Sequence, residues 1–134
     1  MGRLSNWPDK LAEHVEAWRN KKFRWGRYDC ALFCLNAEKV MTGSTSFPEF
    51  INTYSSEKGS IEALAGAGFD SLESLVDARL EQIKLTMAQR GDVALISTPN
   101  GDALSLVIGN HLAAMGRSGL VFLPVSEAKK AWRV

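Results

Sequence analysis

The hydrophobic pattern of the chain changes its period near residue 90, and this change restricts the fold more than any other feature. Upstream, apolar side chains recur at helical spacing, as Leu11, Val15 and Trp18 do. Downstream, short apolar runs alternate with turn-forming residues, at 92–97, 103–110 and 119–125. Because helices come first and strands second, the pattern predicts an α+β fold, with N-terminal helices packed on a small C-terminal antiparallel sheet. The 134 residues are expected to form one domain, residues 1–134.

Local signals set the expected boundaries. A helix is predicted to begin at Trp7-Pro8 and to run to about Asn20, and Asp29 is predicted to cap a second helix that ends at Thr42-Gly43. Shorter helical stripes follow around 60–66 and 71–80.

The second half is predicted to be stranded. Asn100-Gly101 is expected at the tip of a hairpin between the first two strands, and 111–116 is a candidate for a further short strand. Residues 126–134 are expected to form a helical turn that buries Trp132.

The charge balance and the cysteine content argue against several classes of function. Sixteen basic and fifteen acidic residues give a net charge of +1, which provides no electrostatic footprint for nucleic acid or for an anionic membrane. No stretch approaches membrane-spanning length, and the N-terminal sequence lacks the apolar run of a signal peptide. Cys30 and Cys34 have no Cys or His pair to complete a zinc site, so no metal or cofactor is expected. Two free thiols fit a reducing cytoplasm.

The stretch FRWGRYDCALFCLNAEKV, residues 23–40, places Cys30 in what reads as the first turn of a helix. Two interpretations stand: Cys30 is a nucleophile, or it is a small apolar residue at the start of a core helix. A helix N-terminus lowers a thiol pKa and so favours the nucleophilic thiolate. A nucleophilic cysteine also requires a base within hydrogen-bond reach, usually a histidine from elsewhere in the fold. Asp29 is better explained as a helix cap than as a catalytic group.

Three sequence blocks carry a resemblance. WGRYDCALF, from Trp25, is similar to the Gly-x-x-Asp-Cys block of NlpC-type papain-like cysteine peptidases, in which the cysteine is the nucleophile. RGDVALIS (90–97) and LSLVIGN (104–110) resemble two strands of those enzymes in the same order. The resemblance implies a papain-like α+β domain in which the Cys30 helix packs on the sheet, and an activity on peptidoglycan stem peptides.

The whole chain also resembles a family of small phage and prophage proteins. These share the F-x-WG-x-x-DC opening, the RGDV strand, the GLVFLP strand and the terminal AWRV. In phage genomes they resemble members of the tail-tip gene cluster. This resemblance implies a protein made in the host cytoplasm and incorporated in the virion, with other tail-tip or hub proteins as partners.

The histidine of the peptidases has no counterpart at its expected position. Aligning the Gly109-Asn110 turn with that of the enzymes places there one of three residues, none of them histidine: Asp102, Ala103 or Leu104. Their third polar residue is also missing from 122–124. His111 can serve as a base only if the chain folds back toward Cys30, with Asp102 or Asp29 orienting the ring; the favoured interpretation is a surface turn residue. His14 reads as a structural histidine in an apolar stripe, and neither histidine is expected within hydrogen-bond reach of Cys30.

Two classes of function follow from these departures. The favoured one is a degenerate cysteine peptidase kept as a structural or assembly component of the tail tip. The alternative is an active cysteine hydrolase that cleaves peptidoglycan stem peptides during phage entry, with Cys30 as nucleophile. For a docking role, the expected contact surfaces are 47–58, with Phe50 and Tyr54, and 129–134, with Trp132.

Overall fold

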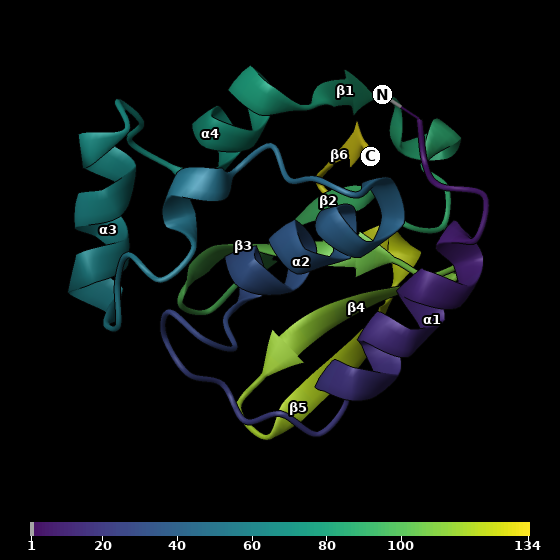
Figure 1. Ribbon diagram of the computed structural model, residues 1–134, viewed down its shortest axis with the longest axis horizontal. Helices are drawn as coiled ribbons and strands as arrows, with labels where there is room; N and C mark the ends of the chain where they lie inside the picture. The colour runs from purple at the N-terminus through teal and green to yellow at the C-terminus, as the bar shows by residue number, and fades with distance from the viewer. Residues whose placement is uncertain (1) are drawn as a thin grey trace.

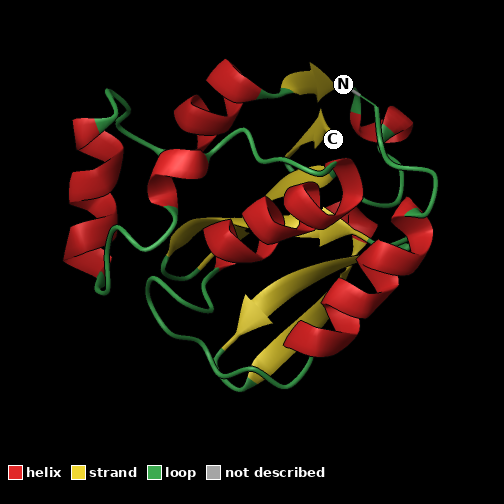
Figure 2. Cartoon of the chain, viewed as in Figure 1, coloured by secondary structure: helices red, strands yellow, loops and turns green. Residues whose placement is uncertain are grey.

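The computed structural model describes residues 2–134 as a layer of helices packed on one antiparallel sheet (Figure 1). The helices are α1 (Trp7–Trp18), α2 (Cys30–Thr42), α3 (Glu57–Gly66) and α4 (Leu72–Arg79). The strands are β1 (Glu81–Ile83), β2 (Val93–Thr98), β3 (Gly101–Val107), β4 (His111–Gly116), β5 (Gly119–Pro124) and β6 (Lys130–Arg133). Short 3-10 turns occupy Pro48–Phe50, Leu85–Met87 and Val125–Glu127. The four α-helices thus precede the six strands along the chain. Helices and strands form separate layers (Figure 2), and the predicted α+β class is confirmed.

The sheet has six strands in the order β1-β6-β2-β3-β4-β5, and every neighbouring pair is antiparallel. The predicted pairing of 92–97 with 103–110 is confirmed by β2 and β3. The strand candidate 111–116 is β4, and it separates β5 from β3. The hairpin tip lies one residue earlier than predicted, at Pro99 and Asn100, because Gly101 already pairs with Thr98.

The C-terminal segment differs from the prediction. Only a 3-10 turn, Val125–Glu127, is helical, and the residues after it form β6, which lies between β1 and β2. Trp132 is fully buried, as predicted, and it pairs with Gln82 on one side and with Val93 on the other. Both partners are distant in sequence, so no local pattern marks β1 or β6 as strands.

Helix α2 crosses the centre of the sheet, with α1 on one side and α3 at the opposite edge of the molecule (Figure 1). Its apolar face, with Phe33, Ala37 and Met41 fully buried, shares one core with Leu95 of β2 and Leu106 of β3. The helix ends as predicted at Gly43, whose positive φ of 92° suits a residue without a side chain. The start of α2 is therefore held over the sheet, and Cys30 with it.

The RGDV block has a structural explanation in the buried Asp92. Its Oδ1 accepts hydrogen bonds from Arg3 Nη2 at 2.8 Å and from the Val134 N–H at 3.0 Å, and its Oδ2 accepts one from the Gln89 N–H at 2.9 Å. Gly91 has a φ of 96° and leaves no room for a Cβ, which would lie 2.9 Å from Met41 Sδ. Asp92, which directly precedes β2, thus binds Arg3 near one end of the chain and Val134 at the other.

Trp132→Ala is expected to destabilise the protein by about 3–5 kcal/mol, because it empties a fully enclosed ring site and leaves Asp77 without the indole N–H that now lies 3.0 Å from its Oδ1. Urea unfolding followed by circular dichroism measures the change. Arg133→Ala, an exposed neighbour on the same strand, serves as the control and should change the free energy of unfolding by less than about 0.5 kcal/mol. Equal effects of the two variants would contradict the assignment of β6 to the core.

Candidate functional site

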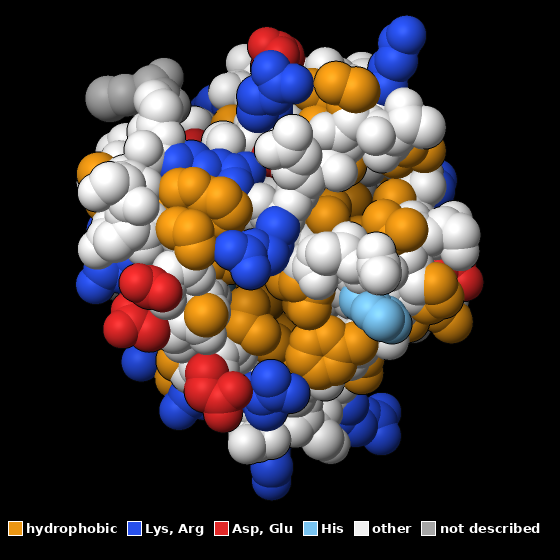
Figure 3. All heavy atoms as spheres, turned by 90° about the vertical axis from the view of Figure 1, so that its right-hand side faces the viewer, with side chains coloured by type: hydrophobic (Ala, Val, Ile, Leu, Met, Phe, Trp, Pro, Cys, Tyr) orange, Lys and Arg blue, Asp and Glu red, His pale blue; other side chains and the backbone are white. Residues whose placement is uncertain are grey.

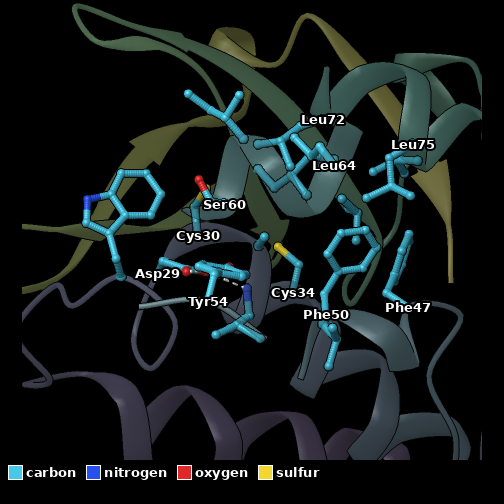
Figure 4. Close-up of a pocket in the computed structure, with 18 of the residues that line it drawn as sticks. Asp29, Cys30, Cys34, Phe47, Phe50, Tyr54, Ser60, Leu64, Leu72 and Leu75 are labelled. Carbon is cyan, nitrogen blue, oxygen red and sulfur yellow. Dashed lines mark hydrogen bonds between the residues drawn. The ribbon is translucent and has the colours of Figure 1, made fainter. Parts of the chain in front are cut away.

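Cys30 and Cys34 line a cavity of about 240 Å³ between α2, the two small helices and the sheet (Figure 4). Both cysteines come from α2, Leu64 comes from α3, and Leu72 and Leu75 come from α4. The remaining lining side chains are Trp25, Asp29, Ala31, Leu32, Leu35, Glu38, Phe47, Phe50, Tyr54, Glu57, Ser60, Ile61, Val76, Leu80, Val93, Asn100 and Leu104. The walls are therefore mainly apolar, with two thiols among them.

The Cys30 thiol stands in the first turn of α2, as predicted, but it is not activated there. Burial raises the pKa of Cys30 to about 11. The backbone of Leu104 acts in the opposite direction, and the charge of Asp29 adds to the increase. The predicted lowering of the pKa by the helix N-terminus is thus outweighed by the apolar surroundings, and Cys30 is a neutral thiol at physiological pH. Burial raises the pKa of Cys34 as well.

Asp29 is a buried residue whose carboxylate accepts hydrogen bonds from three protein donors. Its Oδ1 accepts the Leu32 N–H at 2.9 Å, which caps α2, and its Oδ2 accepts the Gly26 N–H at 3.0 Å and the Tyr54 hydroxyl at 2.6 Å. The carboxylate is 1% exposed. It has no oxygen directed at a histidine, so the prediction of a cap is confirmed, and the suggested role in orienting a base has no structural basis.

Tyr54, which also lines the cavity, completes this network. Burial raises the pKa of the Tyr54 phenol, and the adjacent Asp29 carboxylate raises it further, so the hydroxyl stays a hydrogen-bond donor. Gly26 makes the arrangement possible: its φ is 78°, and a Cβ there would lie 1.9 Å from the Tyr54 carbonyl oxygen. The glycine of the opening block is therefore required by the close approach of two backbone segments.

Neither histidine is placed to act on Cys30. His14 is buried on α1, where its Nε2 lies 2.9 Å from the Phe33 carbonyl and its ring stacks on Phe33. Because a carbonyl only accepts, Nε2 carries the proton. His111 is exposed at the start of β4, opposite Pro124. Across residues 2–134, no hydrogen bond joins Cys30 to an imidazole, as expected, and Leu104 lines the cavity beside Cys30 instead.

The residues suggested for partner contacts lie largely inside the fold. Trp132 is fully buried, and Phe50, which is 7% exposed, lines the cavity. Tyr54 is half-buried and donates to Asp29. Phe50 and Trp132 therefore do not form a docking surface in this conformation, which corrects the suggestion made from the sequence. Large apolar side chains that do reach the surface are Leu4, Ile61, Leu85, Met87, Val121, Phe122 and Val125.

The cavity is formed by segments that the sequence pattern alone does not bring together. Its α3 and α4 walls were predictable as helical stripes, with Ile61 and Leu64 in one and Leu72 and Leu75 in the other. The orientation of α3 and α4 relative to α2 and the sheet depends on contacts between residues far apart in the sequence, which the hydrophobic pattern of each helix does not determine. Within residues 2–134 no group of three His, Cys, Asp or Glu side chains is arranged to bind a metal ion, and no helix is long and apolar enough to cross a membrane.

Taken together, fold and site define an α+β domain in which a helix-start cysteine faces a largely apolar cavity. The chain belongs to the family described as "Domain of unknown function (DUF6950)", which it matches over residues 2–134. No curated protein matches it.

We expect alkylation of Cys30 by iodoacetamide to be about two orders of magnitude slower at pH 8 than alkylation of an ordinary exposed thiol of pKa about 8.5, because so little of the thiol is ionised. Tandem mass spectrometry distinguishes Cys30 from Cys34, and the rate should still rise with pH at pH 9. A rate that has reached its plateau by pH 8 would mean an activated thiol and would contradict this result.

His14 should make the stability depend on pH. Burial lowers the pKa of His14 below its usual 6.5, so its contribution is complete above about pH 6.5 and is lost as the pH falls toward the folded-state pKa. The free energy of unfolding should decrease between pH 7.5 and 5.5, by at most about 1.4 kcal/mol per pH unit from this one group. His14→Phe should flatten the profile, measured by urea unfolding. A decrease of the same size in the His14 variant would exclude this residue as the cause.

Proposed function

We propose that this protein is a structural and assembly component of a phage tail tip, built on an NlpC-type papain-like fold that has lost its hydrolytic activity. The environment of Cys30 is the observation that supports the proposed loss of activity. The thiol is neutral at physiological pH and faces Leu104, one of the residues aligned with the catalytic histidine of the peptidases. The placement in a tail tip comes from the resemblance of the sequence blocks.

The missing base has a quantitative consequence. General-base catalysis contributes typically about 10²–10⁴-fold to a rate, and a thiol of pKa about 11 is almost entirely protonated at pH 7. Asp29 cannot take over the role, because its oxygens accept three hydrogen bonds from within the fold. No other residue of the opening block supplies a base.

The shared blocks can be explained by folding alone. Asp29 caps α2 and binds Tyr54, Asp92 joins the two ends of the chain, and Trp132 fills the core between β1 and β2. Each of these residues is buried and bonded. A binding role requires only the folded surface, whereas hydrolysis also requires an activated cysteine and a base. The structural residues without the catalytic pair therefore suit a binding role.

The proposed docking surface lies on the outside of the molecule, beside α1. Figure 3 shows the face that carries α1, on which hydrophobic side chains gather among lysine and arginine side chains. Phe122 of β5 adjoins this helix: it is 40% exposed, and the Arg19 guanidinium lies 5.5 Å from the centre of its ring. An exposed aromatic ring beside arginine is the composition that interface centres favour.

The alternative function is a cysteine hydrolase that cleaves peptidoglycan stem peptides. One observation favours it: Cys30 stands at the start of a helix and lines a cavity. Purified protein incubated with peptidoglycan sacculi should release no stem peptides if our proposal holds. Release that disappears in Cys30→Ala would overturn the proposal in favour of the hydrolase.

In a phage that carries this protein, Cys30→Ala particles are expected to assemble and infect like the wild type, because the thiol is not used. Phe122→Asp should fold normally, since its ring is partly exposed, yet be lost from purified particles, because the introduced carboxylate would be buried in the interface. Immunoblotting of gradient-purified particles and plaque counts measure both effects.

Phe122→Leu is the matched control, since it keeps an apolar side chain at the same place, and it should be incorporated normally. Purified wild-type particles that lack the protein would contradict the structural role. So would Cys30→Ala particles that assemble normally but fail to cross the cell wall.

A further inference from the structure

The cavity between α2, α3 and α4 has the properties of a binding site for a small ligand. Its volume of about 240 Å³ exceeds the roughly 150 Å³ of an apolar cavity known to hold benzene. It lies just below the range of about 300–1,000 Å³ that is usual for pockets of drug-sized molecules. A ligand that fits is therefore small, of the size of one ring or one short chain.

The two buried acidic side chains that line the cavity, Asp29 and Glu38, are already engaged with protein donors. Asp29 accepts three hydrogen bonds, including that of Tyr54. Glu38, 7% exposed, accepts from Thr45 Oγ1 at 3.0 Å, from the Ser46 N–H at 2.7 Å and from Ser46 Oγ at 2.6 Å. Throughout residues 2–134, every fully buried side-chain nitrogen and oxygen atom has a hydrogen-bond partner.

The charge around the cavity argues against an anionic ligand. Among its described lining residues there is no lysine or arginine, whereas Glu57 contributes a carboxylate at the exposed N-terminal end of α3. Cys30 and Cys34 are held neutral by burial, and neutral thiols behave as small polarisable apolar groups. A fatty-acid carboxylate would thus lose its hydration without a cation to replace it, whereas an uncharged chain carries no charge that must leave water.

The wall formed by α3 offers a route of entry. None of the residues of α3 is buried, and Ile61, which lines the cavity, is 59% exposed. Ser60 and Asn100, partly exposed and exposed, also line it and are neutral hydrogen-bonding groups. They suit a hydroxyl or amide at the end of a ligand whose apolar part lies against Leu64, Leu72 and Leu104.

We propose that this cavity binds a small uncharged aliphatic molecule, with its hydrocarbon part beside Cys30 and Cys34 and a neutral polar end near Ser60 and Asn100. This role is separate from docking in a particle, since it uses the interior of the fold rather than its surface. It requires no ionised thiol, in agreement with the chemistry of Cys30.

Methyl NMR of the full chain with 1-octanol as probe tests the proposal. The methyl signals of Leu64, Leu72 and Leu104 should shift saturably, and those of Leu123, which does not line the cavity, should not. Octanoate at pH 8 has the same chain with a charged end and should bind at least tenfold more weakly. No saturable shift with 1-octanol, or equal affinity for octanoate, would overturn the proposal.

Two variants that fill the cavity from different walls provide the second test. Leu64→Trp on α3 and Leu72→Phe on α4 should each weaken binding of 1-octanol at least tenfold. Ala65→Trp is the matched control, because it adds the same ring to the exposed side of α3, and its affinity should stay within twofold of the wild type. If a filling variant does not fold, as judged by its methyl spectrum, the other decides. A folded filling variant that binds like the wild type would exclude this cavity as the site.

Discussion

The buried carboxylate of Asp29 is the interaction on which the geometry of the site depends. A charge removed from water is tolerated only where donors replace its hydration, and three do so here: the N–H groups of Leu32 and Gly26 and the hydroxyl of Tyr54. These donors belong to the start of α2, the loop before it and a segment that comes after it. The Glu38 carboxylate similarly accepts hydrogen bonds from the N–H and the hydroxyl of Ser46, which lies between α2 and Tyr54 in the sequence. The segment from Ser46 to Tyr54, which contributes Phe47, Phe50 and Tyr54 to the cavity, is therefore positioned by hydrogen bonds to two acidic side chains as well as by packing.

How far the sequence determines this structure depends on the range of each interaction. The boundaries of α2 were predictable because the Asp29 cap and Gly43 act within a few residues of the helix ends. The β2–β3 hairpin was predictable for the same reason, apart from the position of its tip. The strand β6 was not, because its partners lie about 40 to 50 residues away and its short sequence carries no strand pattern. The state of the Cys30 thiol was also out of reach, since its pKa depends on burial by walls that the sequence does not place.

The Asp-Cys pair shows why a motif at a helix start requires its surroundings before it is assigned a chemistry. The helix N-terminus favours a thiolate, whereas the apolar cavity disfavours any charge, and here the second effect prevails. The same apolar cavity that makes Cys30 a poor nucleophile makes it a suitable contact for an uncharged ligand. One structural feature thus argues against a nucleophilic role for the thiol and supports the binding of an uncharged ligand.

The position of β6 between β1 and β2 has a consequence for synthesis on the ribosome. β1 cannot join the sheet until Lys130–Arg133 have emerged, although it is itself translated at residue 81. At about 5–20 residues per second the nascent chain must wait roughly 2–10 s with β1 unpaired. During that interval the strands β2 to β5 are made and α2 can pack on them, whereas Asp77 of α4 still lacks the indole N–H of Trp132. The edge of the sheet that β1 forms is therefore completed last, after the four strands on the other side of β6 have been made.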